Sequence, residues 1–215
     1  MKKILLGIFI NAAFWISPAA QAGPMGFKES TMSMGDFSTN WREGFVNYAL
    51  TSKDAIGSEA VYMRSDNKSL TREAMGLTYT HLAKRWNFPE AQANVWLLGG
   101  ISAVKGNDFD GTRTMLSPGI QFDYETTRLY FATTTRLYRA KNINHDYASV
   151  RAGFSFYEVG YDEVQPWFIL EARRMRGLSE KTEVTPMVRL IHNRYFIEAG
   201  VSTDKQARFN FMYIF

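Results

Sequence analysis

The stretch Arg208-Phe209-Asn210-Phe211-Met212-Tyr213-Ile214-Phe215 decides how the rest of the sequence is interpreted. Aromatic side chains occupy every second position from Phe209 to Phe215. Successive side chains of a β-strand point to opposite faces, so this spacing predicts a strand with one aromatic face. The opposite face begins with Arg208 and Asn210. One side of the strand therefore contacts an apolar environment and the other a polar one.

Six segments upstream repeat this two-faced pattern, and no helical period is found beyond residue 22. Their apolar faces carry Ile120, Phe122 and Tyr124; Leu129, Phe131 and Leu137; Val150, Ala152, Phe154 and Phe156; Phe168, Leu170 and Ala172; Val184, Pro186, Val188 and Leu190; Tyr195, Ile197, Ala199 and Val201. Residues 41–50, 56–65, 73–82 and 92–104 alternate less cleanly. The pattern predicts an all-β chain.

The connections between these segments alternate between tight and long. Tight ones are expected at 125–127, 160–163 and 192–194, and longer polar ones at 65–71, 105–112, 140–146 and 176–181. Transmembrane barrels have short turns on one rim, longer loops on the other and an even strand number. Eleven such segments lie between Trp41 and Phe215. An even number requires residues 27–36 as a first strand, which gives twelve strands, and ten strands are the second choice. Residues 23–40 are thus expected to form either the first strand or a plug.

Charged side chains occupy the face opposite the apolar one in these segments. A charge that faces lipid is costly whereas a barrel lumen is polar, so in a transmembrane antiparallel up-and-down β-barrel these charges point inward. The expected lumen charge network is Asp123, Glu125, Arg136, Arg151, Glu171, Arg173, Glu183, Arg189, Glu198 and Arg208. Aromatic residues near strand ends are candidates for the interfacial girdles: Trp41, Trp86, Trp96, Trp167, Tyr157, Tyr195 and Tyr213. The alternative is a soluble sandwich or lipocalin-like barrel, in which the same faces are reversed.

The first 22 residues have the features of a secretory signal peptide. Lys2 and Lys3 precede an apolar run at 4–16, and Ala20-Gln21-Ala22 matches an A-x-A cleavage site. Cleavage leaves residues 23–215 as a single domain. The sequence contains no Cys, which excludes a lipoprotein anchor, disulfides and thiolate metal sites. Basic residues alternate with acidic ones along the chain, so the formal net charge of +4 does not indicate nucleic-acid binding.

An exported chain that ends in alternating aromatics and a final Phe215 resembles the outer-membrane β-barrels of Gram-negative bacteria, whose last strand carries an assembly signal. The resemblance implies an outer-membrane location, contact with outer-membrane lipid and recognition of the last strand by the barrel assembly machinery. The sequence is also similar to an uncharacterised barrel family associated with heavy-metal resistance genes. That similarity lies in Met32-Ser33-Met34-Gly35-Asp36, Gly106-Asn107-Asp108-Phe109 and Gln121-Phe122-Asp123-Tyr124-Glu125.

Three methionines, Met25, Met32 and Met34, lie close together near the expected mature N-terminus. Thioether sulfur is a soft ligand that favours Cu(I) and similar ions such as Ag(I). The cluster therefore gives one functional hypothesis, a barrel that binds or handles a soft metal ion. The competing interpretation is that Met32 and Met34 are alternate residues on one face of the first strand.

A second alternative is a lipid-directed hydrolase at the outer rim. Asn144-His145-Asp146 is expected to form a loop, with Ser149 at the start of the next strand. In that interpretation His145 is the base, Asp146 orients it and Ser149 is the nucleophile. Adjacent His and Asp side chains rarely point at one another, so no catalytic residue is assigned and an enzyme is not expected.

The leading expectation is a non-enzymatic barrel, either a narrow pore or a structural surface protein with a charged lumen. A twelve-stranded barrel with inward Arg and Glu side chains is narrower than wide diffusion porins, which have about sixteen or more strands.

Overall fold

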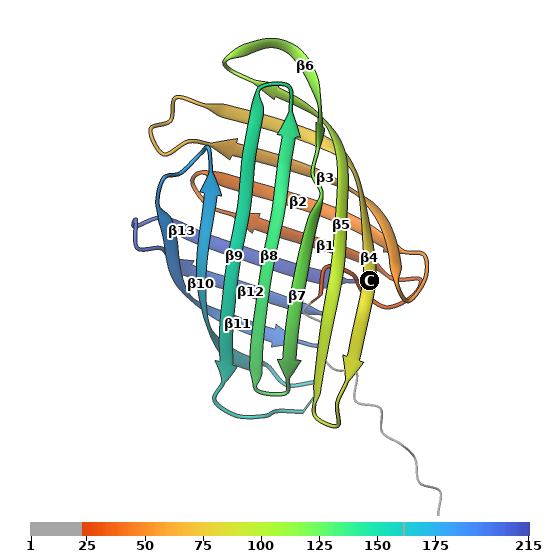
Figure 1. Cartoon of the computed structure of the whole chain (residues 1–215). Coiled ribbons are helices and arrows are strands. Elements are labelled where there is room, and N and C mark those ends of the chain that lie inside the picture. Colours follow the sequence, from red (N-terminus) through yellow and green to blue (C-terminus); the bar gives the residue numbers. More distant parts are fainter. Residues whose placement is uncertain (1–22, 161) are drawn as a thin grey trace, which may run out of the picture.

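The computed structural model describes residues 23–160 and 162–215, which form one closed antiparallel β-barrel (Figure 1). The interpretation of residues 1–22 as a signal peptide concerns residues outside the described ones. The strands are β1 Thr31–Phe37, β2 Trp41–Ala49, β3 Asp54–Arg64, β4 Thr71–Asn87, β5 Ala91–Gly106, β6 Phe109–Leu116, β7 Gly119–Thr126, β8 Leu129–Ala140, β9 Ile143–Ser155, β10 Gln165–Arg176, β11 Thr182–His192, β12 Tyr195–Val201 and β13 Ala207–Ile214. Within 23–160 and 162–215, no helix is long and apolar enough to span a membrane.

The barrel has twelve strands, because β6 and β7 act as one. Both pair with β5, Leu116 opposite Ile101 and Gly119 opposite Leu98, and only Ser117 and Pro118 separate them. Pairing of β1 with β13 and of β4 with β5 closes the sheet, so it lacks the two end strands of an open sheet. Near the far rim, β6 pairs with β5 but meets β8 only at Leu116 opposite Arg139. The prediction of a closed, antiparallel twelve-stranded barrel is confirmed.

The even strand number puts both ends of the described chain at one rim, here called the N-terminal rim. This rim carries connections 50–53, 88–90, 127–128, 156–164 and 193–194, and the far rim carries 38–40, 65–70, 107–108, 141–142, 177–181 and 202–206. The first strand is β1, which begins later than the expected residue 27. Residues 23–26 instead run against the inner wall at the N-terminal rim, where the Nδ2 of Asn47 donates to the carbonyl of Pro24 at 2.8 Å. Residues 27–30 form a turn that leads into β1 and is exposed at 27–29, in which the amide of Ser30 donates to the carbonyl of Phe27.

Three connections differ from the expected lengths. Residues 105–112 and 140–146 were expected to be long loops, but each contains a two-residue turn, 107–108 and 141–142, inside a continuous hairpin. The hairpin strands continue to the far rim with polar residues, and this composition resembles that of a loop. The tight turn expected at 160–163 lies within a longer connection, 156–164. At the two-residue turn 193–194, Asn193 has φ of 53°, a conformation that Asn adopts more readily than most residues.

The outer face of the barrel is apolar. Its large exposed side chains include Val46, Tyr48, Ile56, Met75, Leu77, Tyr79, Leu97, Ile101, Ile120, Leu129, Phe131, Val150, Phe154, Phe168, Leu170, Val188, Leu190, Tyr195, Ile197, Phe209 and Tyr213. Buried charged residues such as Glu59, Arg173 and Glu198 point inward. This distribution is the reverse of a soluble barrel, which keeps apolar side chains inside and charges outside.

The interior contains three layers of side chains. The far-rim cluster is apolar and consists of Trp41, Val61, Met63, Ala74, Val104, Met115, Tyr138, Ile143, Met175 and Leu178. The central layer is charged. Three further apolar clusters lie toward the N-terminal rim, around residues 23–34 and the strand ends at that rim. Trp41, Trp96 and Trp167 belong to these inner clusters. Their assignment to an interfacial girdle is therefore wrong, whereas Trp86, Tyr157, Tyr195 and Tyr213 are exposed.

Candidate functional site

The candidate site is the central layer of the lumen, in which ion pairs join strands from different parts of the wall. Five arginines and six carboxylates define this central charge layer: Arg136, Arg151, Arg173, Arg189 and Arg208 with Asp36, Glu43, Glu59, Glu171, Glu183 and Glu198. The two signs nearly balance. The layer thus carries strong local fields with little net charge.

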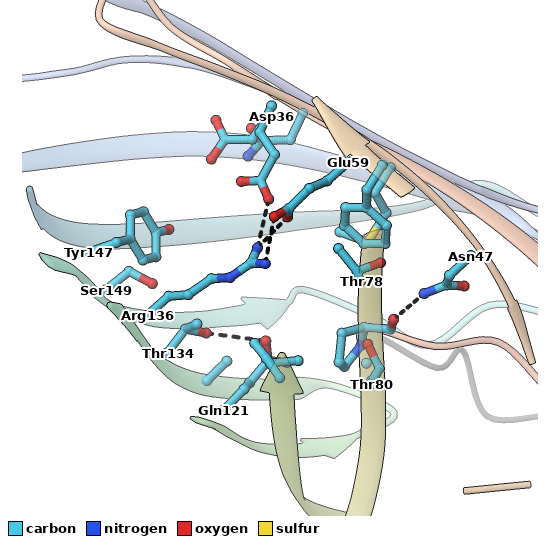
Figure 2. A pocket seen from close by; sticks show the side chains of 18 of the residues that line it. Asp36, Asn47, Glu59, Thr78, Thr80, Gln121, Thr134, Arg136, Tyr147 and Ser149 are labelled. Atoms are coloured by element: carbon cyan, nitrogen blue, oxygen red, sulfur yellow. Dashed lines mark hydrogen bonds and ion pairs between the residues drawn. The ribbon is translucent and has the colours of Figure 1, made fainter. Parts of the chain in front are cut away.

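Arg136 spans the lumen from β8 to the opposite wall. Its Nη1 lies 2.7 Å from Oε2 of Glu59 on β3 and 3.3 Å from Oε1 of Glu43 on β2 (Figure 2). Its Nη2 also donates to Oγ of Ser117, at the break between β6 and β7. The indole Nε1 of Trp41 donates to Glu43 at 3.2 Å. This bridge narrows the lumen directly beneath the far-rim cluster.

A second group of charges surrounds Glu198 on β12. Arg151 donates to Oε2 of Glu198, and Nε of Arg189 donates to Oε1 at 2.5 Å. Asn210 adds a third donor at 2.7 Å. The guanidinium of Arg189 also lies 4.5 Å from the ring centroid of Tyr130. Glu198 is only 1% exposed, so these donors replace the water that its carboxylate loses.

The third group joins β1, β10, β11 and β13. Arg208 donates to Asp36 at 3.0 Å and lies 3.4 Å from Glu171, while Arg173 donates to Glu183 at 2.8 Å and lies 3.4 Å from Asp36. Asp36 therefore links two arginines from strands far apart in the sequence. Such pairs fix which strands face each other across the lumen.

A cavity of about 170 Å³ lies beside this layer. Its lining runs from Gly23 and Pro24 at the N-terminal rim to Tyr138 and Tyr147 beneath the far-rim cluster. Figure 2 shows Thr134 and Gln121 among the polar side chains directed into it. The Oδ1 atoms of Asn47 and Asn210 are buried without a hydrogen-bond partner among the described residues, and both asparagines line the cavity. The cavity can therefore hydrogen-bond water or a small polar solute.

Both ends of the cavity are narrow. At the far rim, Trp41, Met63, Met115 and Tyr138 are each at most 1% exposed. At the N-terminal rim, Gly23 lies against the indole of Trp96, since a Cβ there would be only 2.7 Å from Cζ2. Met25 packs with Ala49, Ala55, Leu82 and Trp96. The lumen is a packed interior with a small polar chamber.

The structure places the ten residues of the expected charge network as follows. Arg136, Arg151, Glu171, Arg173, Glu183, Arg189, Glu198 and Arg208 lie in the central charge layer. Asp123 also faces inward but nearer the N-terminal rim, where Asn94 and Trp96 each donate to it at 2.6 Å. Glu125 lies two residues further along β7, on the same face as Asp123.

Inward charges that the sequence analysis missed include Asp36, Glu43, Glu59, Arg72 and Arg85. They lie on β1 to β4, where the alternation is unclear. Glu43 shares its face with Trp41 and Phe45, and the outer face of the same strand carries Arg42 and Gly44. No local signal decides the face of Glu43, because Arg42 and Glu43 are adjacent and one of the two charges points outward in either orientation.

The three methionines of the soft-metal hypothesis occupy two different clusters. Met25 packs with Trp96 and its neighbours, whereas Met32 and Met34 pack with Phe196, Met212 and Ile214. The structure therefore does not group the three thioethers in one set. Among residues 23–160 and 162–215, no three His, Asp or Glu side chains form a group that could hold a metal ion.

The candidate hydrolase residues are not assembled. His145, expected in an exposed loop, lies within β9 with its side chain buried and pointing inward. Asp146 points to the opposite face, where it pairs with Arg139 and Arg176. Ser149 is inward but four residues along the strand, about 13 Å from His145 at the rise of a β-strand. No base, orienting group and nucleophile meet here.

No protein-family model matches the chain, and no curated protein matches it either. Among solved structures, it is similar to the KdgM porin in complex with disordered oligogalacturonate, at 13% identity and a TM-score of 0.49, over 86% of this chain and 98% of that chain. It is similar to the KdgM porin at 12% identity with the same TM-score and coverage. OmpTdeltaL8, a loop-deletion mutant of an outer membrane protein of Vibrio cholerae, gives 8% identity and a TM-score of 0.33, over 86% of this chain and 97% of that chain. These likenesses concern the fold.

Proposed function

We propose that this chain is a non-enzymatic outer-membrane β-barrel that forms a narrow, restrictive pore. The observation that carries the proposal is the distribution of side chains on a closed barrel, apolar outside and charged inside. An apolar wall suits the hydrocarbon core of a membrane, and closure of the sheet pairs backbone groups between neighbouring strands around the barrel. A lumen lined by Asp36, Glu43 and Arg136 beside polar hydroxyls suits small hydrated solutes.

The proposed orientation places the N-terminal rim in the periplasm and the far rim outside the cell. An exported chain reaches the outer membrane from the periplasm, so its ends remain on that side when hairpins cross. Both chain ends lie at the N-terminal rim. Exposed Tyr195, Tyr213 and Phe215 near this rim suit an interfacial aromatic girdle.

The pore is proposed to be restrictive because three features narrow it. Arg136 crosses the lumen, the far-rim cluster is fully buried, and residues 23–25 pack against Trp96 at the other end. The cavity between them measures about 170 Å³, room for a few water molecules at about 30 Å³ each. Wide diffusion is therefore not expected.

The test of this function combines membrane fractionation with conductance. The protein is expected in outer-membrane fractions, with a gel migration that shifts on boiling, and to give small single-channel currents in planar bilayers. Soluble periplasmic protein without a heat shift would overturn the membrane location. Large, weakly selective currents would instead overturn the restrictive lumen.

Deletion of residues 23–25 is expected to raise the single-channel conductance by less than about twofold, because the Arg136 bridge and the far-rim cluster remain in series with the opened end. Gly23 and Met25 pack against Trp96, and removing them opens the end of the cavity at the N-terminal rim. The strand pairings should remain because these residues precede β1, whereas loss of the buried Met25 lowers the free energy of unfolding by about 2–5 kcal/mol. Planar-bilayer recording of the truncated and full-length proteins measures the effect, with Met25→Leu as a control that keeps the packing. Equal currents would mean that the Arg136 bridge or the far-rim cluster limits the current, and that residues 23–25 do not.

Deletion of Phe215 is expected to lower the amount of assembled barrel in the outer membrane while leaving the lumen unchanged. The side chain is exposed on the outer wall and lies edge-on to Tyr213 at 4.6 Å between centroids. It is thus available to the barrel assembly machinery. The heat-shifted fraction on gels measures assembly, with Phe156→Ala as a control at another exposed Phe. Refolding of the variant in detergent at the native yield would separate recognition from stability.

A further inference from the structure

A groove of about 650 Å³ lies in the outer wall near the far rim. It crosses β1 to β5, and the side chains that line it include Phe37, Arg42, Ala60, Met75 and Lys105. We call it the outer groove. It faces away from the lumen, so the pore does not use it.

The strand registers explain the recess. Gly44, Ala60, Met75 and Ala103 lie opposite one another on β2, β3, β4 and β5. Three of these four side chains are small, whereas most outward positions carry large apolar residues. A Cβ added at Gly44 would meet no atom within 4 Å. The wall is therefore hollow at this row on both sides of Met75, which projects between Ala60 and Ala103, and Phe37 lies at one edge of the recess.

The row next to the far rim carries charge. Arg42, Tyr62, Glu73 and Lys105 lie opposite one another on the same four strands. Among the described residues, neither Arg42 nor Lys105 has a carboxylate within ion-pair distance, and the guanidinium of Arg42 lies 5.4 Å from the ring centroid of Tyr62. Glu73 stands between the two cations, so the row has one net positive charge. Both cations remain available to an anionic partner.

We propose that the outer groove binds lipid A, the phosphorylated glycolipid anchor of the outer leaflet, with acyl chains over Gly44 and Ala60 on one side of Met75 and over Ala103 on the other, and with its phosphates at Arg42 and Lys105. This proposal rests on the proposed membrane location and orientation. In a membrane, a recess in the wall is filled by lipid chains, and basic residues at the interface bind lipid phosphates. Arg suits a phosphate especially well because its guanidinium donates two parallel hydrogen bonds.

The spacing of the two cations favours a lipid with two phosphates. Arg42 and Lys105 are three strand spacings apart, about 14 Å. A phospholipid with one phosphate contacts one of them, whereas a headgroup with a phosphate at each end of a disaccharide contacts both. Glu73 then lies beneath the sugar between the two phosphates.

The test is native mass spectrometry of the full barrel released from micelles that contain diphosphoryl lipid A. Wild type is expected to retain one lipid, and Arg42→Gln with Lys105→Gln to lose it about tenfold or more, the effect of losing charge-assisted contacts. Gly44→Leu, which fills the recess without changing charge, should also lose it, and Glu73→Gln should retain it better. Arg174→Gln with Lys141→Gln is the matched control, since both are exposed basic residues near the far rim outside the groove.

Equal retention by wild type and the Arg42, Lys105 double variant would overturn the proposal. Equal retention of monophosphoryl lipid A or of phosphatidylglycerol would also overturn it, because it would indicate general lipid contact. Dimers that form without lipid and that Gly44→Leu disrupts would overturn it as well, because the groove would then bind a second copy of the chain. Conductance of the same preparations distinguishes failure of the lipid A proposal from failure of the proposed pore function. If the double variant and wild type give equal currents but neither retains lipid A, only the groove proposal fails.

Discussion

Replacement of Glu198 by alanine is expected to destabilise the barrel by about 3–5 kcal/mol, the usual cost of removing one partner from a buried ion pair. Glu198 accepts from Arg151, Arg189 and Asn210, and it is 1% exposed. Its loss leaves two guanidinium groups close together without a shared carboxylate. The remaining partner of Arg151 is Glu171, at 3.7 Å.

Urea unfolding of the barrel in lipid vesicles, followed by gel mobility, measures this effect. Glu198→Gln keeps the shape and the hydrogen-bond acceptor but removes the charge, so it should fall between wild type and the alanine variant. Glu90→Gln in the exposed connection 88–90 is the control for loss of one acid. A change in unfolding free energy below about 1 kcal/mol for Glu198→Ala, the value of a surface pair, would mean that water already screens the central layer.

The double change Arg136→Ser with Glu59→Ser is expected to raise the single-channel conductance several-fold. Arg136 and Glu59 form the bridge that crosses the lumen between β8 and β3. The double change removes one charge of each sign and two long side chains, so the lumen widens and its net charge is unchanged. Glu43 keeps its hydrogen bond from Trp41.

A matched control exists on the outer face of β8 and its neighbour β9. Arg139 and Asp146 form an ion pair between β8 and β9, away from the lumen. Arg139→Ser with Asp146→Ser therefore removes the same kind of pair without widening the pathway, and its currents should equal those of wild type. If the Arg136, Glu59 variant also matches wild type, the bridge does not limit the current.

The alternation of the later strands was sufficient to predict their faces. Glu198 between Ile197 and Ala199, and Arg189 between Val188 and Leu190, leave only one orientation in an apolar surrounding. The earlier strands could not be interpreted in this way. On β2, inward Trp41 and outward Arg42 reverse the expected chemistry, because one packs in the far-rim cluster and the other lies at the edge of the outer groove.

The partners of the charges could not be predicted from the sequence. Asp36 meets Arg173 and Arg208 because β1 closes the barrel against β13 and faces β10 across the lumen. These neighbours follow from the strand registers around the whole barrel, and no local pattern contains them. The predicted loop position of His145 was wrong for a related reason, since the strands of a polar hairpin near the rim have the composition of a loop.

The seam between β1 and β13 also has a kinetic consequence. Met32 pairs with Ile214 and Phe37 with Phe209, so the outer edges of β1 and β13 stay uncovered until these two strands meet. Contacts between such distant segments are slow to form, because a long loop must close first. Until β13 arrives, β1 exposes unpaired backbone groups, which favours aggregation. The unfolded chain therefore depends on protection from aggregation until the barrel closes. The last step of folding joins the two end strands of one sheet into a closed ring, whereas an open sheet would grow by adding a strand at its edge.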